Sequence, residues 1–279
     1  MEVIRAKRAG ACYGVQRALD LAMRAAERSG AVYSLGPLIH NPIVVAQLEE
    51  QGVRVAHSVA EIPDGSTIVI RSHGVTPSVM REARAVSEDI VDATCPFVAR
   101  AQSCAEELAL SAGCVIVVGE EGHPEVEGLI ERAREAHAKA YVVPSSDSLP
   151  DSLYDPVGIV VQTTQRAENL NAVVEALRAR GIEPEVKRTI CTATSERQDA
   201  AAELASQVDA MVVIGGRNSS NTTRLAEICA DRCAKTFHIE SIDEIDSDWF
   251  AGCSVLGITA GASTPEDQIQ AVEEFLGAL

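Results

Sequence analysis

The sequence predicts an α/β protein made of three similar lobes, and two observations lead to that prediction. Short strands rich in Val and Ile alternate with helices rich in Ala, Leu, Glu and Arg along the whole chain, as in βαβ units with a parallel sheet. The same order of elements also recurs three times at nearly equal intervals. We therefore expect a trefoil of lobes around a pseudo-threefold axis. Their expected ranges are 13–95, 96–190 and 191–269, with residues 1–12 and 270–279 packed against them.

The individual elements follow from hydrophobic patterning. Short segments rich in Val and Ile that end at Gly, Ser or Thr are expected to be strands, and longer segments rich in Ala, Leu, Glu and Arg are expected to be helices. The expected strands are 68–72, 114–119, 158–163, 210–215 and 254–259. The expected helices include 15–28, 98–111 and 195–208.

Composition limits the possible functions and locations. Hydrophobic residues make up 46% of the chain and aromatic residues only 3%, so the core must consist of Ala, Val, Ile and Leu, as in parallel strands under helices. A formal net charge of −17 argues against a nucleic-acid or anionic-membrane partner. No apolar run is long enough to span a membrane, and charges interrupt the N-terminal segment, so no signal peptide is expected. Eight cysteines in such a chain indicate reduced thiols, metal ligands or small buried residues rather than disulfides, and a cytoplasmic location is expected.

The repeat is anchored on Cys12, Cys95 and Cys191, each of which opens a helix. Each helix leads to a strand that is followed by a glycine at one fixed distance from the cysteine, and a polar residue follows each glycine at another fixed distance. These glycines are Gly36, Gly119 and Gly215, and the polar residues are His40, His123 and Ser219. The next strand in each repeat ends in a polar turn: SHG, QTT or AGAST. The alternative is a single Rossmann-like sheet in which the spacing is accidental.

The position of these cysteines indicates a shared metal centre. Ligands of parallel α/β sheets bind outside the carboxyl ends of the strands, where helices begin, and all three cysteines are expected at that edge. Three thiolates that face one axis would repel one another unless a cation held them, and both zinc and iron–sulfur clusters bind thiolates. The CxxC pairs typical of zinc sites are missing. Three distant ligands suit a cluster with one open iron better than a single ion, although any one of them could be a small buried residue.

Polar side chains at the strand ends indicate a site for an anion. Lys and Arg are scarce in these loops, apart from Arg71 and Arg217, so imidazole, hydroxyl and amide groups would have to bind it, aided by helix N-termini. Helix capping explains one or two of these residues but not the run of them in GGRNSSNTT. The candidate binding residues are His40, His73, His123, Thr163, Ser219, Ser220, Asn221 and Ser263. His57, His137 and His238 lack this context and are expected to be surface residues.

Glu125 is the carboxylate that stands beside the candidate residue His123, in HPEVEG. An enclosed carboxylic acid near a metal centre can relay a proton if desolvation raises its pKa. The alternative is a first-turn glutamate that stabilises the following helix through its dipole, a role that Glu127 fits better.

Nine segments of the sequence together resemble the 4-hydroxy-3-methylbut-2-enyl diphosphate reductase family. In order they are GACYGVQRAL, GPLIHNPIVV, RSHGV, DATCP, GHPEVEG, QTT, ICTATSERQ, GGRNSSNTTRLAE and TAGASTP. The resemblance implies one [4Fe–4S] cluster with an open iron, [3Fe–4S] after oxidation, held by Cys12, Cys95 and Cys191. It implies that the candidate binding residues surround the substrate, chiefly its diphosphate, and that Glu125 is the proton donor.

The implied reaction is the last step of the non-mevalonate (methylerythritol phosphate) isoprenoid pathway. It is the two-electron reductive dehydroxylation of (E)-4-hydroxy-3-methylbut-2-enyl diphosphate to isopentenyl and dimethylallyl diphosphates. The partners implied are this small allylic diphosphate and an electron donor of the ferredoxin or flavodoxin type. Three alternatives remain open: an iron–sulfur hydro-lyase, which needs no reductant; a non-enzymatic iron–sulfur redox sensor; and a structural zinc protein, which contains no sulfide.

Overall fold

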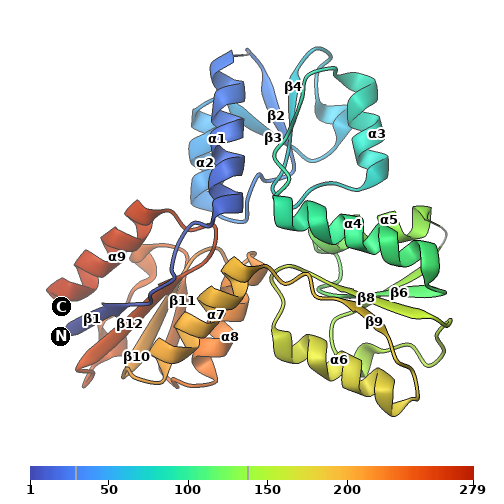
Figure 1. Ribbon diagram of the computed structural model, residues 1–279. Helices are drawn as coiled ribbons and strands as arrows, with labels where there is room; N and C mark the ends of the chain where they lie inside the picture. Colours follow the sequence, from blue (N-terminus) through green and yellow to red (C-terminus); the bar gives the residue numbers. More distant parts are fainter. Residues whose placement is uncertain (29, 137) are drawn as a thin grey trace. The chain divides into compact units, whose positions relative to one another are not determined.

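The computed structural model describes residues 1–28, 30–136 and 138–279, so His137 and its expected surface location lie outside the described residues. It contains three parallel four-stranded sheets, each flanked by helices (Figure 1). The three sheets have the same internal order, in which the first strand of the repeat lies between the second and the third, and a fourth strand lies at the edge. The predicted class, three α/β lobes with parallel sheets, is confirmed.

The first sheet has the order β3-β2-β4-β5. Its strands are β2 (Val32–Leu35), β3 (Val53–Ala56), β4 (Thr67–Ile70) and β5 (Ile90–Asp92). The neighbouring helices in the chain are α1 (Tyr13–Arg28), α2 (Pro42–Glu50) and α3 (Pro77–Val86).

The second sheet has the order β7-β6-β8-β9. Its strands are β6 (Cys114–Val118), β7 (Lys139–Val143), β8 (Val157–Val161) and β9 (Glu185–Lys187). Its helices are α4 (Pro96–Ser111), α5 (Pro124–Glu135) and α6 (Ala167–Ala179).

The third sheet has the order β1-β12-β10-β11, so the N-terminal strand completes the C-terminal sheet. Its strands are β1 (Glu2–Arg5), β10 (Ala210–Ile214), β11 (Thr236–Ile239) and β12 (Val255–Ala260). Its helices are α7 (Thr192–Ala205), α8 (Ser220–Ala230) and α9 (Glu266–Ala278).

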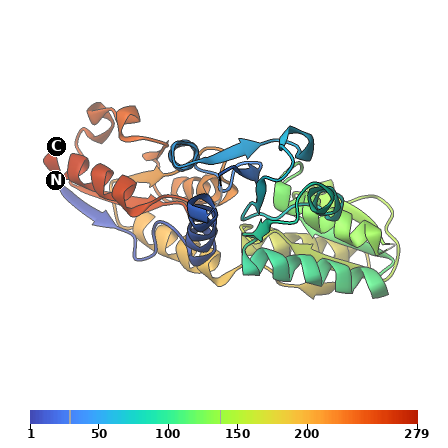
Figure 2. The same ribbon diagram turned by 90° about the horizontal axis from the view of Figure 1, so that it is seen from above.

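Contacts divide the chain into two compact units, which are described separately below. The first unit comprises residues 1–15, 40–45 and 192–279 and contains the third sheet. The second unit comprises residues 16–39 and 46–191 and contains the first and second sheets. Figure 1 shows α4 and α5 on one face of the second sheet and α6 on the other, and Figure 2 shows the same elements from above.

Strand β6 shows why these strands are apolar at every position. Val115 and Val117 pack under α4 and α5, while Ile116 and Val118 pack on the opposite face against α6. All four side chains are fully buried. Because successive strand residues point to opposite faces and both faces are covered, no position tolerates a polar side chain. This explains why β6 is apolar throughout its length.

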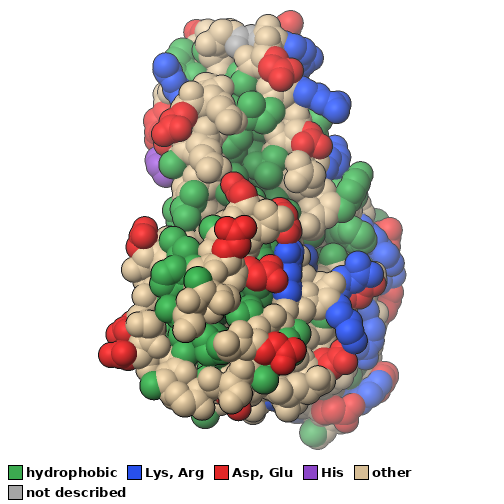
Figure 3. Space-filling model, turned by 90° about the vertical axis from the view of Figure 1, so that its left-hand side faces the viewer, with side chains coloured by type: hydrophobic (Ala, Val, Ile, Leu, Met, Phe, Trp, Pro, Cys, Tyr) green, Lys and Arg blue, Asp and Glu red, His purple; other side chains and the backbone are tan. Residues whose placement is uncertain are grey.

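The surface is acidic, in keeping with the net charge. Asp and Glu side chains are spread over the face shown in Figure 3, with Lys and Arg side chains among them. Among the described residues, no helix has the length and apolar character needed to cross a membrane.

Candidate active site

One backbone hydrogen bond recurs at all three predicted cluster ligands. The N–H of each cysteine donates to the carbonyl of the residue two positions beyond the third strand of a sheet. These bonds are Cys12 to Ala262 (3.1 Å), Cys95 to Ser72 (2.9 Å) and Cys191 to Thr163 (3.2 Å). The sequence repeat is therefore matched by a repeated backbone interaction at the carboxyl edge of each sheet.

The three cysteines share a local environment as well. Each side chain is partly exposed, and each cysteine directly precedes a helix: α1, α4 or α7. Cys114 and Cys229, in contrast, are completely buried in the cores of the second and third sheets. Burial raises the pKa of both of these thiols, and that of Cys229 rises to about 12. Buried thiols of this kind act as small apolar residues rather than as ligands.

In the second unit, Glu125 and Thr163 form a closed pair. Glu125 lies in the first turn of α5 and is 0% exposed, and Thr163 follows β8. The Thr163 N–H donates to one carboxylate oxygen at 2.7 Å, and the Thr163 hydroxyl donates to the other at 2.9 Å. The Thr163 carbonyl also accepts a hydrogen bond from the N–H of Cys191. Thr163 therefore connects the predicted acid, Glu125, to a predicted cluster ligand, Cys191.

The Glu125 carboxyl has an unusual acidity. Burial raises its pKa from the ordinary value of 4.5 to about 7, while the two Thr163 hydrogen bonds act in the opposite direction and the Glu120 carboxylate adds a smaller upward shift. Complete enclosure disfavours the charged form more strongly than two hydrogen bonds favour it. Glu125 can therefore hold a proton near neutral pH and release it, as a general acid must.

His123 is fixed in one tautomer by its place at the start of α5. It is the N-cap residue, and its Nδ1 accepts a hydrogen bond of 3.1 Å from the N–H of Glu125. In the neutral ring the proton must then reside on Nε2, which becomes a donor. Burial, and secondarily the positive charge of Arg71, lower the pKa of His123 to about 4. The imidazole is thus neutral at physiological pH.

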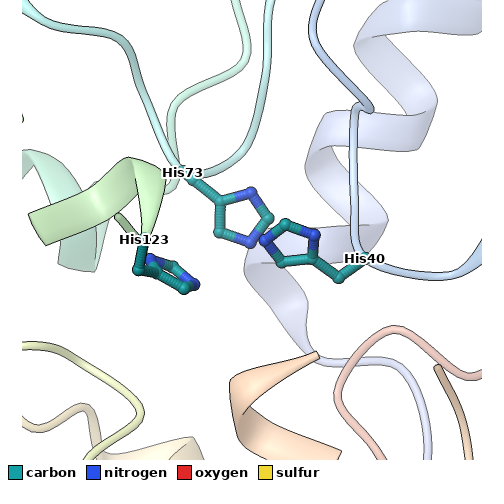
Figure 4. Close-up of side chains that lie close together, drawn as sticks. All are labelled: His40, His73 and His123. Carbon is teal, nitrogen blue, oxygen red and sulfur yellow. The ribbon is translucent and has the colours of Figure 1, made fainter. Parts of the chain in front are cut away.

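His73 lies in the turn between β4 and α3, in the same unit as His123. The two rings face each other edge to face, with centroids 5.5 Å apart (Figure 4). Gly74 adopts a φ of +71°, a conformation that glycine adopts readily and that lets the chain close the turn after His73. His40, the third imidazole labelled in Figure 4, belongs to the other unit and is described with it.

The first unit contains the polar run at the start of α8. Ser219 is the N-cap residue, and its hydroxyl accepts from the N–H of Thr222 at 3.4 Å. Ser220 and Asn221 are 6% and 4% exposed. Within the described chain, neither the amide nitrogen nor the amide oxygen of Asn221 has a hydrogen-bond partner. A buried amide without partners is costly, so this side chain has hydrogen-bonding capacity available for a ligand.

The backbone of His40 is held by the loop after β12. The Ser263 hydroxyl donates to the His40 carbonyl at 3.1 Å, and the Asn41 amide donates to the Ser263 carbonyl at 2.9 Å. A Cβ atom on Gly216 would lie 2.7 Å from the same His40 carbonyl, so only glycine fits there. The first unit thus joins His40 to Ser263, which directly follows the residue bonded to Cys12.

Two residues of these loops were not among the predicted site residues. Asn41 accepts the N–H groups of Ile43 and Val44 and so caps α2, and the sequence signal was an Asn directly before Pro42 at a helix start. Gln162 is 0% exposed and accepts the N–H of Glu120 at 3.0 Å, which fixes the loop that leads to His123. It stands in the QTT turn, where the predicted site residue is Thr163.

Each cysteine is therefore bonded to a loop that carries a predicted site residue. The loop of Cys95 carries His73, the loop of Cys191 carries Thr163, and the loop of Cys12 carries Ser263. Cys95, Cys191, His73, His123, Glu125 and Thr163 belong to the second unit, and Cys12, His40, Ser219, Ser220, Asn221 and Ser263 belong to the first.

Comparison with known proteins agrees with these features. The family model described as "LytB protein" matches residues 3–277. The chain is 49% identical to the 4-hydroxy-3-methylbut-2-enyl diphosphate reductase of Geotalea uraniireducens (strain Rf4), over 98% of this chain and 96% of that protein. It is also 49% identical to the reductase of the same name from Trichlorobacter lovleyi (strain ATCC BAA-1151 / DSM 17278 / SZ), over 95% and 94% of the two chains.

Two solved structures have the same fold. One is an (E)-4-hydroxy-3-methyl-but-2-enyl diphosphate reductase, described as the terminal enzyme of the non-mevalonate pathway, with 40% identity, full coverage of both chains and a TM-score of 0.72. The other is the E-1-hydroxy-2-methyl-but-2-enyl-4-diphosphate reductase from Plasmodium falciparum, with 25% identity, coverage of 100% of this chain and 87% of that one, and a TM-score of 0.91. On this evidence, the chain belongs to the LytB protein family.

Proposed function

We propose that this protein is a 4-hydroxy-3-methylbut-2-enyl diphosphate reductase, which acts at the last step of the non-mevalonate isoprenoid pathway. The observation that carries this proposal is the enclosed Glu125–Thr163 pair, hydrogen-bonded to the loop in which Cys191 stands. It combines a proton donor active near neutral pH with a candidate redox ligand. The same activity is supported by the relatives that match nearly the full chain, which are named 4-hydroxy-3-methylbut-2-enyl diphosphate reductase.

The cofactor we propose is one [4Fe–4S] cluster with one open iron, converted to [3Fe–4S] by oxidation. Its ligands would be Cys12, Cys95 and Cys191. Their chemistry fits: all three are reduced, partly exposed thiols at helix starts, where negative charge is favoured. When bound, such a cluster supplies electrons one at a time, and its open iron supplies a Lewis acid for the C4 hydroxyl group.

The diphosphate would be bound by neutral donors. The free amide of Asn221 and the hydroxyls of Ser219 and Ser220 lie at the N-terminus of α8, where the helix dipole favours anions. The Nε2–H of neutral His123 is a further donor. His40, His73 and Ser263 complete the proposed set. Neutral donors suit a diphosphate that must be released again as part of the product.

The proton that converts the leaving hydroxide to water would come from Glu125. The overall change consumes two electrons and two protons: one proton leaves in water and the other is added to the allyl carbon skeleton. With its pKa near 7, Glu125 is available in the protonated form at neutral pH. The Thr163 hydroxyl, 2.9 Å from the carboxylate, can accept that proton while passing on its own. Thr163 would thus serve as the relay.

The electron donor we propose is a small ferredoxin or flavodoxin, and the proposed location is the cytoplasm. Neither nucleic acid nor membrane is part of the proposal, because a formal charge of −17 repels both kinds of polyanionic surface.

The test is an anaerobic assay of the reconstituted protein. Purified chain is loaded with iron and sulfide, supplied with a low-potential reductant and (E)-4-hydroxy-3-methylbut-2-enyl diphosphate, and its products are separated. We expect isopentenyl and dimethylallyl diphosphates, formed only with reductant. Turnover without reductant would instead identify a hydro-lyase, and a fully loaded protein without any turnover would favour a redox sensor.

A further inference from the structure

Arg71 and Arg217 both lie in loops at the carboxyl ends of strands, and their surroundings differ. Arg217, after β10, forms ion pairs with Glu240 and Glu244, so its charge is compensated within its own lobe. Arg71, after β4, has no carboxylate within ion-pair distance among the described residues. The Nε–H of its guanidinium donates a hydrogen bond to the Gly74 carbonyl at 3.1 Å. Within the described part of the chain, the positive charge of Arg71 thus has no carboxylate beside it.

The guanidinium of Arg71 is held between the backbones of two glycines, Gly36 and Gly74. A Cβ atom on Gly36 would collide with its Nη1, and Gly36 has a φ of +73°, so the guanidinium lies against a bare glycine backbone at the end of β2. The Gly74 N–H donates back to the Arg71 carbonyl at 2.9 Å. Arg71 and Gly74 are thus bonded to each other in both directions across the turn Arg-Ser-His-Gly, and His73 is one of the two residues inside that turn.

The position of Arg71 is partly removed from water. Its side chain is only partly exposed, and burial lowers the pKa of the guanidinium below its ordinary value, which leaves it charged. The positive charge of Arg71 also lowers the pKa of His123, in addition to the larger effect of burial. A partly desolvated cation without an anionic partner is unfavourable. Such a cost is offset when an anion binds nearby.

The other two lobes have no charge at this place. The residue directly after the third strand is Gln162 in the second sheet and Gly261 in the third. Gln162 lies against Gly119 as Arg71 lies against Gly36, so the two side chains occupy equivalent positions. The fold therefore accepts a neutral amide here, and the cation of the first lobe is not needed to build it.

We propose that Arg71 is a positioning residue for the substrate: it balances the negative charge of the bound diphosphate and holds the His73 turn in its binding conformation. This inference rests on the proposed function, since it takes the anion near His73 and His123 to be the diphosphate group. Arg71 acts through these two histidines and through its field rather than on the reacting carbon.

The experiment compares Arg71→Gln, Arg71→Lys and a matched control, Arg54→Gln, in the anaerobically reconstituted protein. Arg54 is an exposed arginine on β3 whose contacts are with Tyr33, so its replacement removes the same charge from the same lobe without touching the turn. Calorimetry measures the Kd of inorganic pyrophosphate, and the activity assay measures kcat and KM with the allylic diphosphate. Iron content and thermal unfolding show that each variant is folded and loaded.

Arg71→Gln is expected to raise both the pyrophosphate Kd and the KM about tenfold, with kcat within about twofold, because it removes one charge at short range in a partly desolvated site. Arg71→Lys should recover most of this affinity, and Arg54→Gln should differ little from wild type. Equal affinities of Arg71→Gln and Arg54→Gln would overturn the inference, as would equal losses in Arg71→Gln and Arg71→Lys. If pyrophosphate affinity follows this pattern but wild type does not reduce the allylic substrate, the proposed function fails and the anion role of Arg71 stands.

Discussion

Glu125 and Thr163 are joined by two hydrogen bonds, one from the Thr163 N–H and one from its hydroxyl, and each reaches a different carboxylate oxygen. The N–H bond fixes the orientation of the carboxyl group whatever its charge. The hydroxyl can donate to the ionised carboxylate, or turn and accept a proton from the neutral acid. A single threonine therefore serves both protonation states, which a proton relay requires.

Stability is expected to depend on the charge of Glu125. Because burial raises its pKa in the folded chain from 4.5 to about 7, the folded protein keeps a proton that the unfolded chain has lost between these two pH values. The free energy of unfolding should then fall as pH rises through this window, by at most about 3 kcal/mol. Urea unfolding of wild type and Glu125→Gln from pH 4 to 8 measures it. The variant should lose this slope, and identical slopes would show that Glu125 titrates normally.

Glu125→Gln should nearly abolish turnover while leaving iron content and pyrophosphate affinity intact. An amide of the same shape can still accept the Thr163 N–H bond, but it has no proton to give, and loss of a general acid costs about 10²- to 10⁴-fold in rate. Glu127→Gln is the control, because Glu127 is an exposed carboxylate in the same first turn of α5. A kcat for Glu125→Gln close to that of Glu127→Gln would exclude Glu125 as the proton donor.

Thr163→Val removes the hydroxyl and keeps the N–H. The carboxylate of Glu125 then loses one of its two bonds inside a closed site, which should cost about 1–3 kcal/mol of stability when Glu125 is ionised. It should also lower kcat much more than it changes KM. Thr163→Ser retains the hydroxyl and should keep most of the activity. Similar rates for the Val and Ser variants would argue against a relay through this oxygen.

His123 has a capping role that can be separated from its proposed binding role. Its Nδ1 accepts the N–H of Glu125 at the start of α5. His123→Ala should lose this cap, about 1 kcal/mol of stability, and diphosphate affinity together. His123→Asn should restore the cap through its side-chain oxygen but not the affinity. Thermal unfolding and pyrophosphate calorimetry distinguish the two effects. Full affinity in the Asn variant would mean that the imidazole is needed for capping alone.

The central strands and long helices could be predicted because their residues are buried on two faces or follow a helical period. β4, β6, β8, β10 and β12 all coincide with predicted strands within one or two residues. The edge strands could not be predicted: β1 is four residues long, two of them charged, and β5 and β9 have three residues each. Such segments become strands by pairing with a neighbour rather than through their own pattern.

The candidate site, too, could be predicted in part from the sequence. Glu125 and Thr163 were selected from separate motifs, and their direct contact follows from the parallel order of β6 and β8. The pairing of β1 with β12, which brings the loop of Cys12 to that of Ser263, has no local signal. The sequence also gives no local signal that Arg217 forms ion pairs and Arg71 does not. That difference depends on Glu240 and Glu244, which lie more than twenty residues after Arg217 in the chain.

The most direct measurement is the iron and acid-labile sulfide content of the anaerobically reconstituted chain, for wild type and for single Cys→Ser variants. We predict about four of each per wild-type chain, and a severe loss in Cys12→Ser, Cys95→Ser and Cys191→Ser alike. Cys104→Ser and Cys253→Ser, two partly exposed controls, should bind as wild type does. A variant of residue 12, 95 or 191 that keeps a full cluster, or a wild-type chain that takes up zinc without sulfide, would contradict a cluster held jointly by these three cysteines.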